Sequence, residues 1–406
     1  MSLIPSKTWT AVGEALLADA IHLRRAIHGE PELGLDTPKT TAKVKAALAG
    51  LPLEIREGSS TSGLVAVLHG APGPRVLLRG DMDALPLIED TGLPFASRVP
   101  GAMHACGHDA HVAMLVAAAR ALCAQRESLA GSVMFMFQPG EEGWHGARFM
   151  LEDGLLDPLP DAAFALHISP TMRHGVIASR AGALLAASDK LHIEVKGRGG
   201  HASMPHDALD PVPIACEIVL ALQTMVTRRT SVFDPAVISV PQIEAGGADN
   251  VIPETVKLWG TIRTLSERTR KLVHEAIEGL VHGIAAAHGA EAELEIRQGF
   301  PVTVCDGRVV DLVELAARTL FGDQGWIRMP NPVMGAEDFA YVLQKVPGAM
   351  AWLGAAGPDA DLRHCCALHS NHMVIDEQVM ARGIAMHCAM AEAMLAAAPL
   401  SPDPAA

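Results

Sequence analysis

The chain has 406 residues, of which 49% are apolar and 19% are charged, and its formal net charge is −14. The length favours two domains over one, and the apolar content excludes an intrinsically disordered chain. The negative charge opposes binding to phosphate backbones and anionic lipid surfaces, so we expect neither nucleic acid nor a membrane as a partner.

The sequence predicts no membrane segment and no exported precursor. No run approaches the roughly 20 uninterrupted apolar residues of a transmembrane helix, and charged residues interrupt the N-terminal segment, which is not typical of a signal peptide. The seven cysteines are odd in number and include the neighbours Cys365 and Cys366, which does not indicate a disulfide framework. We therefore expect a reducing, cytoplasmic location.

The first part of the chain alternates helical and extended patterns. Helical spacing of apolar residues predicts helices over 8–28, 37–48 and 111–124. Short apolar runs bounded by Gly or Pro predict buried strands at 63–68, 75–78, 132–137 and 162–166. The fold class is therefore α/β, with a helix-covered mixed sheet in the first domain.

A second region begins near residue 189. Its pattern predicts elements in the order strand, helix, strand, strand, helix, strand, at 190–196, 208–228, 236–244, 255–264, 266–288 and 292–297. This βαββαβ order is that of a ferredoxin-like unit. The α/β pattern returns after Pro301, so we predict a large domain of residues 1–187 and 301–406, which also carries the candidate metal ligands described below, with an inserted domain at 188–300.

The segment Met103–His111 clusters residues that bind metals. It places Cys106 and His108 two positions apart, directly before the apolar helix. Thiolate and imidazole both bind zinc and related divalent ions, and a helix N-terminus favours the thiolate form. The alternative is that Cys106 is a small buried residue and the histidines are capping or surface groups.

Carboxylates and further histidines follow other predicted strands. Glu141 and Glu142 come after a strand that is predicted to be fully buried, and His167 ends the next apolar run. Burying two adjacent carboxylates costs several kcal/mol unless a cation or a shared proton compensates. Such groups gather where the carboxyl ends of strands meet. Alternatively, the Glu pair lies in a solvated loop and the histidine is structural.

Two more loops add polar groups. His369 follows a loop rich in Gly, Asp and Cys, and Asp81 and Asp83 follow another predicted strand. The two aspartates would suit an outer layer of the site, where each orients a ligand histidine by accepting its other N–H.

Several of these segments resemble a known family of enzymes. They are Gly80–Pro86, His104–His111, Gln138–Gly143, Gly200–Ser203, Met334–Phe339 and Leu368–His369. They are similar to the motifs of the dinuclear-metal amidohydrolases related to aminoacylase and carboxypeptidase G. Within that group they look most like the branch of hippurate hydrolase and the auxin–amino-acid conjugate hydrolases.

The resemblance implies a site for two divalent metal ions. Cys106 would bridge them, His108 and His167 would complete one ion's ligands, and Glu142 and His369 would complete the other's. Glu141 would be the general base that moves a proton from the attacking water to the leaving amine. Other branches have carboxylates in the places of Cys106 and His167, so Zn, Mn, Ni and Co all remain open.

The inserted domain also has positions that match the family. His201 resembles a histidine that stabilises the developing oxyanion, often from a partner subunit, and Asn250 and Arg263 resemble groups that bind the substrate carboxylate. Arg suits this role because its planar fork binds a carboxylate in a bidentate manner. The resemblance implies that this domain acts as a lid and forms a homodimer.

We therefore expect a metal-dependent amidohydrolase that cleaves N-acyl amino acids into a carboxylic acid and a free amino acid. The substrate is a small molecule, and its acyl group is not defined by the sequence. Two alternatives stay open: a hydrolase with Cys106 as the nucleophile, and a relative that binds the ligand without catalysis.

Overall fold

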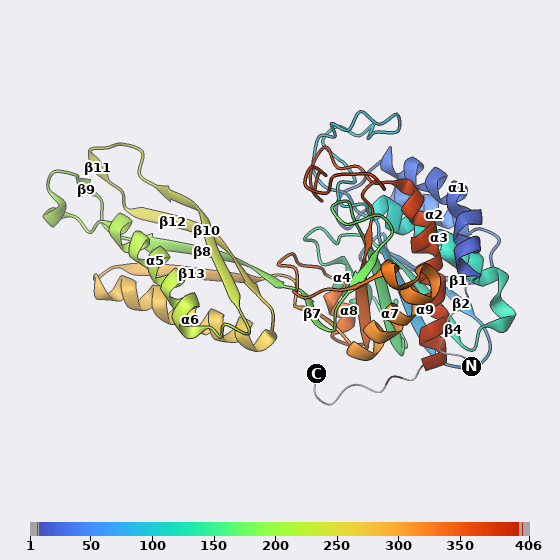
Figure 1. The fold of residues 1–406 in the computed structure, drawn as a ribbon. Coiled ribbons are helices and arrows are strands. Elements are labelled where there is room, and N and C mark those ends of the chain that lie inside the picture. The colour runs from blue at the N-terminus through green and yellow to red at the C-terminus, as the bar shows by residue number, and fades with distance from the viewer. Residues whose placement is uncertain (1–5, 7, 398–399, 401–406) are drawn as a thin grey trace. The chain divides into compact units, whose positions relative to one another are not determined.

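The computed structural model describes residues 6, 8–397 and 400, and its ribbon is drawn in Figure 1. The chain forms two compact units. The first consists of the chain up to Leu184, Val304–Asn331 and the chain from Asp338 onward. The second consists of Leu185–Thr303 and Pro332–Glu337.

The second unit is larger than the predicted insertion at 188–300. It has three further residues at each end, and it includes the short segment Pro332–Glu337, which the sequence patterns did not assign to it. The residues that we predicted at the ends of the catalytic domain, 1–5, 7, 398–399 and 401–406, lie outside the described residues.

An eight-stranded mixed sheet forms the centre of the first unit. Its spatial order is β1 (Leu53–Glu57), β2 (Leu64–His69), β4 (Ser132–Gln138), β3 (Arg75–Asp81), β5 (Ala162–Ser169), β16 (Gly348–Gly354), β6 (Ile177–Ser179) and β15 (Trp326–Arg328). Strands β4, β3, β5 and β16 run parallel to one another and are almost entirely buried. The predicted α/β class with a mixed sheet is confirmed, and the parallel strands share one carboxyl edge.

The first unit also contains the helices that follow or precede these strands along the chain. They are α1 (Trp9–His28), α2 (Pro38–Leu48), α3 (His108–Ala124), α4 (Gly146–Glu152), α7 (Gly307–Phe321), α8 (Ala340–Leu343) and α9 (Met380–Ala397), with short 3-10 turns at Arg126–Ser128, Asp323–Gly325 and Glu377–Val379. Helix α3 packs against α1, α9 and β3, and nearly all residues of α3 and α9 are buried. Among the described residues, one helix, Glu377–Ala397, has the length and composition to cross a membrane, and 83% of its apolar window is buried inside the structure. A helix that is buried in a protein core can have the same length and apolar composition as a membrane-spanning one.

The second unit contains a four-stranded antiparallel sheet with two helices. Along the chain the elements are β8 (Ala187–Lys196), α5 (Pro211–Arg229), β10 (Ala236–Ala245), β12 (Thr255–Thr264), α6 (Glu267–Ala287) and β13 (Glu291–Gln298). The spatial order β10-β12-β8-β13 makes β10 and β13 the edge strands. Apolar residues of the sheet and of both helices form one core, which includes Ile193, Ile218, Leu258 and Ile277.

Smaller elements complete the fold. In the second unit, β9 (Gly200–His201) pairs with β11 (Val251–Ile252), and a 3-10 turn covers Pro205–Asp207. Strands β7 (Gly182–Leu185) and β14 (Thr303–Cys305) pair where the chain passes between the units.

Alanine substitutions at two helix glycines, Gly13 and Gly279, should change the free energy of unfolding in opposite directions. A Cβ atom at Gly13 of α1 would lie 2.1 Å from the backbone oxygen of Ala381 in α9, whereas Gly279 of α6 is exposed and has no atom within 4 Å of such a Cβ. We expect Gly13→Ala to lower the free energy of unfolding by about 1–3 kcal/mol through overpacking. Gly279→Ala should raise it by about 0.4–1 kcal/mol, because it restricts the unfolded chain. Urea denaturation checks both, and equal effects would contradict this packing.

Candidate metal centre and active site

Three neighbouring parallel strands deliver side chains to one edge of the large sheet. Strand β3 ends at Asp81, with Asp83 two residues later, and Glu141 and Glu142 follow the end of β4. His167 lies near the end of β5. Because these strands are parallel, their carboxyl ends meet at the same edge, where ligands of α/β sheets bind.

A tight turn places Cys106 and His108 on either side of Gly107. Gly107 has a φ of 83° and is the N-cap residue of α3, so His108 is the first residue of that helix. A Cβ atom at Gly107 would lie 2.5 Å from the side chain of Ile168, so the turn requires glycine for both conformation and space. The helix therefore begins three residues earlier than the apolar pattern predicted.

His369 comes from the loop that follows β16. Its φ of 67° is in the left-handed region, which is uncommon for a residue other than glycine and often marks a functional position. Its backbone N–H donates to the backbone oxygen of Ala105 at 2.7 Å, and this bond ties the loop to the segment that carries Cys106. The ring is half exposed, and its Nε2 lies 3.2 Å from Oε1 of Glu142.

The five predicted ligands form two groups that share Cys106. One group is Cys106, His108 and His167, and the other is Cys106, Glu142 and His369; within each group the potential ligand atoms lie within 4.8 Å of one another. These residues are separated by up to 263 positions along the chain. The structure therefore brings all five together in the first unit.

The buried His108 ring has one satisfied and one unsatisfied nitrogen. Its Nδ1–H donates to the backbone oxygen of Asp83 at 2.9 Å, whereas Nε2 has no hydrogen-bond partner. Carboxylate oxygens of Asp81, Glu141 and Glu142 lie 3.4, 4.0 and 4.0 Å from Nε2. Burial alone would lower the pKa of His108, but the charge of Asp81 and the bond to Asp83 raise it to about 10. The same negative charge attracts a divalent cation, which displaces the proton on binding.

Cys106 and His167 are buried side by side, with Sγ of Cys106 3.4 Å from Nε2 of His167. His167 Nδ1–H donates to the backbone oxygen of Ile168 at 2.7 Å, so its Nε2 lone pair faces the sulfur. Burial and the charge of His111 hold the pKa of His167 well below its usual range, and the ring is therefore neutral. Burial and the nearby Glu142 carboxylate raise the pKa of the Cys106 thiol well above its usual range. A thiolate in this position requires a neighbouring cation.

These observations show that the residues fit a pair of divalent metal ions. His108 and His167 each donate Nδ1–H to a backbone carbonyl, which is the arrangement that orients metal-binding histidines. His108 Nε2 is buried without a hydrogen-bond partner, and Glu142 Oε1 is buried 3.2 Å from Nε2 of His369. Sulfur, nitrogen and carboxylate oxygen together suit zinc and related divalent ions.

The two aspartates have more contacts than the sequence predicted. The prediction was that they orient ligand histidines by accepting the other N–H group. Asp83 faces Nδ1 of His108 through its backbone oxygen at 2.9 Å and its carboxylate at 3.5 Å, and the carboxylate also accepts the backbone N–H groups of Glu141 and Glu142 at 2.9 and 3.0 Å. Asp81 accepts Nδ1–H of His111 at 2.6 Å, and His111 Nε2 accepts the backbone N–H of Ile168, so His111 has no free nitrogen for a metal.

Sequence reasoning missed a group of buried polar residues behind the Glu pair. Asp338, Arg79 and Gln138 are nearly inaccessible to solvent and are joined by hydrogen bonds. Asp338 lies within the segment Met334–Phe339, which carried the family resemblance without an assigned role. That segment was the signal for this residue, although it did not indicate which groups Asp338 contacts.

The other three predicted site residues belong to the second unit. His201 is exposed on β9, and its neighbour Ala202 donates a backbone N–H to the backbone oxygen of Asn250 at 3.1 Å. Arg263 lies on β12 opposite Ser188, and burial lowers its pKa. His201 and Asn250 are therefore close to each other within this unit.

Comparison with known proteins agrees with this geometry. N-acetyl-L-cysteine deacetylase of Bacillus subtilis is 38% identical over 85% of this chain and 82% of the relative. IAA-amino acid hydrolase ILR1-like 4 of Arabidopsis thaliana is 34% identical over 96% of this chain and 89% of the relative. The crystal structure of a Bacillus subtilis dinuclear metal binding peptidase from the M20 family matches with a TM-score of 0.81 and 33% identity, over 94% of this chain and 99% of that one.

The family assignment rests on most of the chain. The model of peptidase family M20/M25/M40 matches residues 77–393, a range that contains every predicted metal ligand, the whole second unit and most of the first. Relatives named as amide hydrolases and a solved structure named as a dinuclear metal binding peptidase match over 85–96% of this chain. The chain belongs to peptidase family M20/M25/M40.

Proposed function

We propose that this protein is a metal-dependent amidohydrolase that cleaves the amide bond of N-acyl amino acids. The observation that carries the proposal is the pair of ligand groups that share Cys106, next to the buried carboxylate of Glu141. The names of the relatives support it, because they describe deacetylation of N-acetylcysteine and hydrolysis of IAA-amino acids. The products would be a carboxylic acid and a free amino acid.

Five side chains would hold two divalent ions, with Zn, Mn, Ni and Co as candidates. Cys106 would contact both, His108 and His167 would complete one set, and Glu142 and His369 would complete the other. When bound, such ions polarise the substrate carbonyl and lower the pKa of the attacking water.

Glu141 is the proposed general base. Its backbone N–H is fixed by Asp83 at 2.9 Å, and its Oε2 lies 4.0 Å from Nε2 of His108. In the reaction Glu141 takes a proton from water as the water oxygen bonds to the amide carbon. The carbon–nitrogen bond then breaks, and Glu141 delivers the proton to the leaving nitrogen.

The second unit supplies the remaining proposed groups. His201 would donate to the developing oxyanion, from the same chain or from a partner subunit. Asn250 and Arg263 would bind the substrate carboxylate. We propose that this unit acts as a lid, because closure would exclude water from the reacting groups.

The surroundings of Cys106 count against the alternative in which its sulfur attacks the substrate. Without a cation, burial and neighbouring carboxylates keep the thiol protonated, whereas a nucleophilic cysteine needs its thiolate. The alternative of a relative without catalysis is opposed by the presence of Glu141 among the ligand groups.

Chelation and one variant test the proposed chemistry. Exhaustive chelation should abolish hydrolysis, and added Zn or Mn should restore it. Glu141→Gln should lower kcat by about 10²–10⁴-fold while the metal content stays unchanged, because Glu141 moves a proton and is not a ligand. The measurements are steady-state kinetics and elemental analysis.

Glu152→Gln on α4 is the matched control, since this exposed glutamate forms an ion pair with the neighbouring Arg148 at 3.4 Å and is not one of the proposed ligands. It should keep wild-type activity. Full activity of the chelated protein, or a Glu141→Gln variant as active as the wild type, would contradict the proposed function.

A substrate panel defines the acyl group and tests the carboxylate site. N-benzoyl, N-acetyl and indole-acetyl amino acids should each be compared with their carboxamide forms at a fixed metal concentration. We expect blocking the carboxylate to lower kcat/KM about ten-fold or more, since hydrogen bonds to charged groups contribute about 1.5–3 kcal/mol. Equal rates for the free and blocked forms would remove Asn250 and Arg263 from this role.

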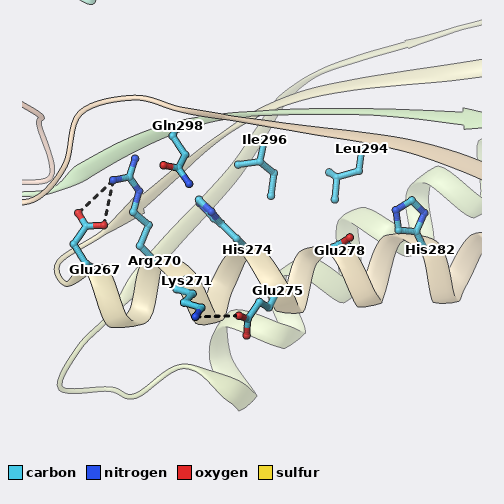
Figure 2. Close-up of a pocket in the computed structure, with 10 residues that line it drawn as sticks. All are labelled: Glu267, Arg270, Lys271, His274, Glu275, Glu278, His282, Leu294, Ile296 and Gln298. Carbon is cyan, nitrogen blue, oxygen red and sulfur yellow. Dashed lines mark hydrogen bonds and ion pairs between the residues drawn. The ribbon is translucent and has the colours of Figure 1, made fainter. Parts of the chain in front are cut away.

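We also propose that the chain forms a homodimer through the second unit. Strand β13 is an edge strand, and beside it α6 forms a groove of about 580 Å³, in which Leu294 and Ile296 of the strand face the helix residues His274, Glu278 and His282 (Figure 2). The opposite edge strand, β10, contains Pro241 and an irregular register near it, features that protect an edge from pairing. The β13 edge is regular and can accept a strand from a second copy.

Two Ile→Lys variants distinguish the edges. Ile296→Lys on β13 should convert a particle of twice 42.7 kDa into one of 42.7 kDa, because it places a charge on the proposed edge strand. Ile296 also packs against the core of the second unit, so thermal unfolding must show that the variant is folded. Ile243→Lys on β10 is the control and should leave the mass unchanged, since Ile243 is 53% exposed on the other edge strand. Light scattering after size-exclusion chromatography gives the masses. A monomeric wild type, or a dimer that survives Ile296→Lys, would contradict the proposal.

The location stays a prediction with one supporting observation. All seven cysteines lie among the described residues and all are free. Free thiols in this number are typical of a reducing compartment, so we propose a cytoplasmic location.

A further inference from the structure

We propose that Asp338 is a positioning residue that holds the segment carrying Glu141 and Glu142 in its reactive geometry. The proposal rests on the proposed function, because it concerns the base and a ligand of that site. It assigns a role to a residue outside the five ligand positions and outside the two aspartates discussed above.

The carboxylate of Asp338 contacts both ends of this segment. One oxygen accepts Nε2–H of Gln138, the last residue of β4, at 2.6 Å. The other accepts the backbone N–H of Ala147, in the first turn of α4, at 2.9 Å. Asp338 is completely buried, so water does not replace either bond. A single carboxylate therefore fixes where the segment 139–146 begins and where it ends.

The segment 139–146 needs this restraint because its glycines allow many backbone conformations. Gly140 has a φ of 71°, and its backbone oxygen accepts the N–H of Gly146 at 3.0 Å, so the segment folds back on itself. Asp83 holds its middle through the N–H groups of Glu141 and Glu142. With Asp338 at both ends and Asp83 in the middle, the two glutamates lie on a backbone that is fixed at three points.

Arg79 connects this restraint to the ligand residues. Its Nη2 donates to Asp338 at 3.2 Å, its Nε donates to Oε1 of Gln138 at 2.9 Å, and its Nη1 donates to Asp81 at 2.6 Å. Asp81 in turn lies 3.4 Å from Nε2 of His108. One buried guanidinium thus neutralises two carboxylates and joins the restraint to the proposed metal site.

Asp338 also lies beside the proposed base. One of its carboxylate oxygens is within 4.8 Å of a carboxylate oxygen of Glu141. A change in its position is therefore transmitted to Glu141 directly as well as through the backbone.

Asp338→Asn tests the proposal, since it keeps the size of the side chain and removes its charge. Binding of Co²⁺ to the chelated protein, followed by the visible and near-ultraviolet absorption of the bound ion, reports on the ligands independently of activity. We expect the Kd for Co²⁺ to rise about 10- to 100-fold, the range found when residues behind a metal site are changed. With saturating metal, kcat should fall about ten-fold or more while KM stays within two-fold, because no substrate contact is removed.

A second substitution should restore the function. In the double variant Gln138→Glu/Asp338→Asn the carboxylate and the amide exchange places, so the bond between residues 138 and 338 forms with reversed polarity. The new Glu keeps a negative charge next to Arg79, and the Asn oxygen can still accept the N–H of Ala147. We expect the double variant to recover most of the Co²⁺ affinity and kcat. Gln138→Glu alone should be worse than the double variant, because it sets two carboxylates against each other.

The possible results distinguish a failure of the proposed function from a failure of the proposed role of Asp338. If the wild type neither binds Co²⁺ nor hydrolyses N-acyl amino acids, the proposed function fails. If the wild type does both and Asp338→Asn has the same Kd and kcat, the role of Asp338 is overturned. If Asp338→Asn does not fold, judged by thermal unfolding, Gln138→Leu removes one end of the restraint and keeps the Asp338–Arg79 ion pair. It should then weaken Co²⁺ binding about ten-fold, and unchanged binding would overturn the proposal.

Discussion

Buried negative charge at one edge of the large sheet is the constraint on which the rest of this structure depends. Asp81, Asp83 and Glu141 are almost inaccessible to solvent, and Glu142 adjoins them. Burying carboxylates is unfavourable unless cations or hydrogen-bond donors compensate. Arg79 and backbone N–H groups compensate part of this charge. The ligand groups around Cys106 give positions at which divalent ions can balance the remainder.

The architecture explains how distant residues reach this edge. Parallel strands bring the loops after β3, β4 and β5 together, and the turn at Gly107 adds the first residue of α3. Most residues of helices α3 and α9 are buried, and both helices pack against the sheet from which these loops extend. The site is therefore placed by the buried core of the first unit, whereas the loop with His369 joins it through a hydrogen bond to Ala105.

Much of the fold and the set of ligands could be predicted from the sequence, because both depend on local patterns. The predicted strand 255–264 matches β12, and the ligand positions came from short motifs. The edge strand β1 was missed because it is short and has only two apolar residues, Leu53 and Ile55. The partners of Asp338 could not be predicted, since Arg79 and Gln138 lie 259 and 200 positions away and only packing brings them together. For the same reason the predicted contact of Asp83 with a histidine is only part of its role, since its carboxylate also accepts the backbone N–H groups of Glu141 and Glu142.

The segment Pro332–Glu337 has a consequence for how such a protein can be rearranged by evolution. It belongs to the second unit, where the backbone oxygens of Val333 and Gly335 accept the N–H of Ala186. The second unit is thus assembled from two separate stretches of chain and is not a module that one deletion or one transfer could move intact. The second stretch is immediately followed by Asp338 in the sequence. Any exchange of this unit between relatives has a junction next to Asp338, whose carboxylate contacts both ends of the segment that carries Glu141 and Glu142.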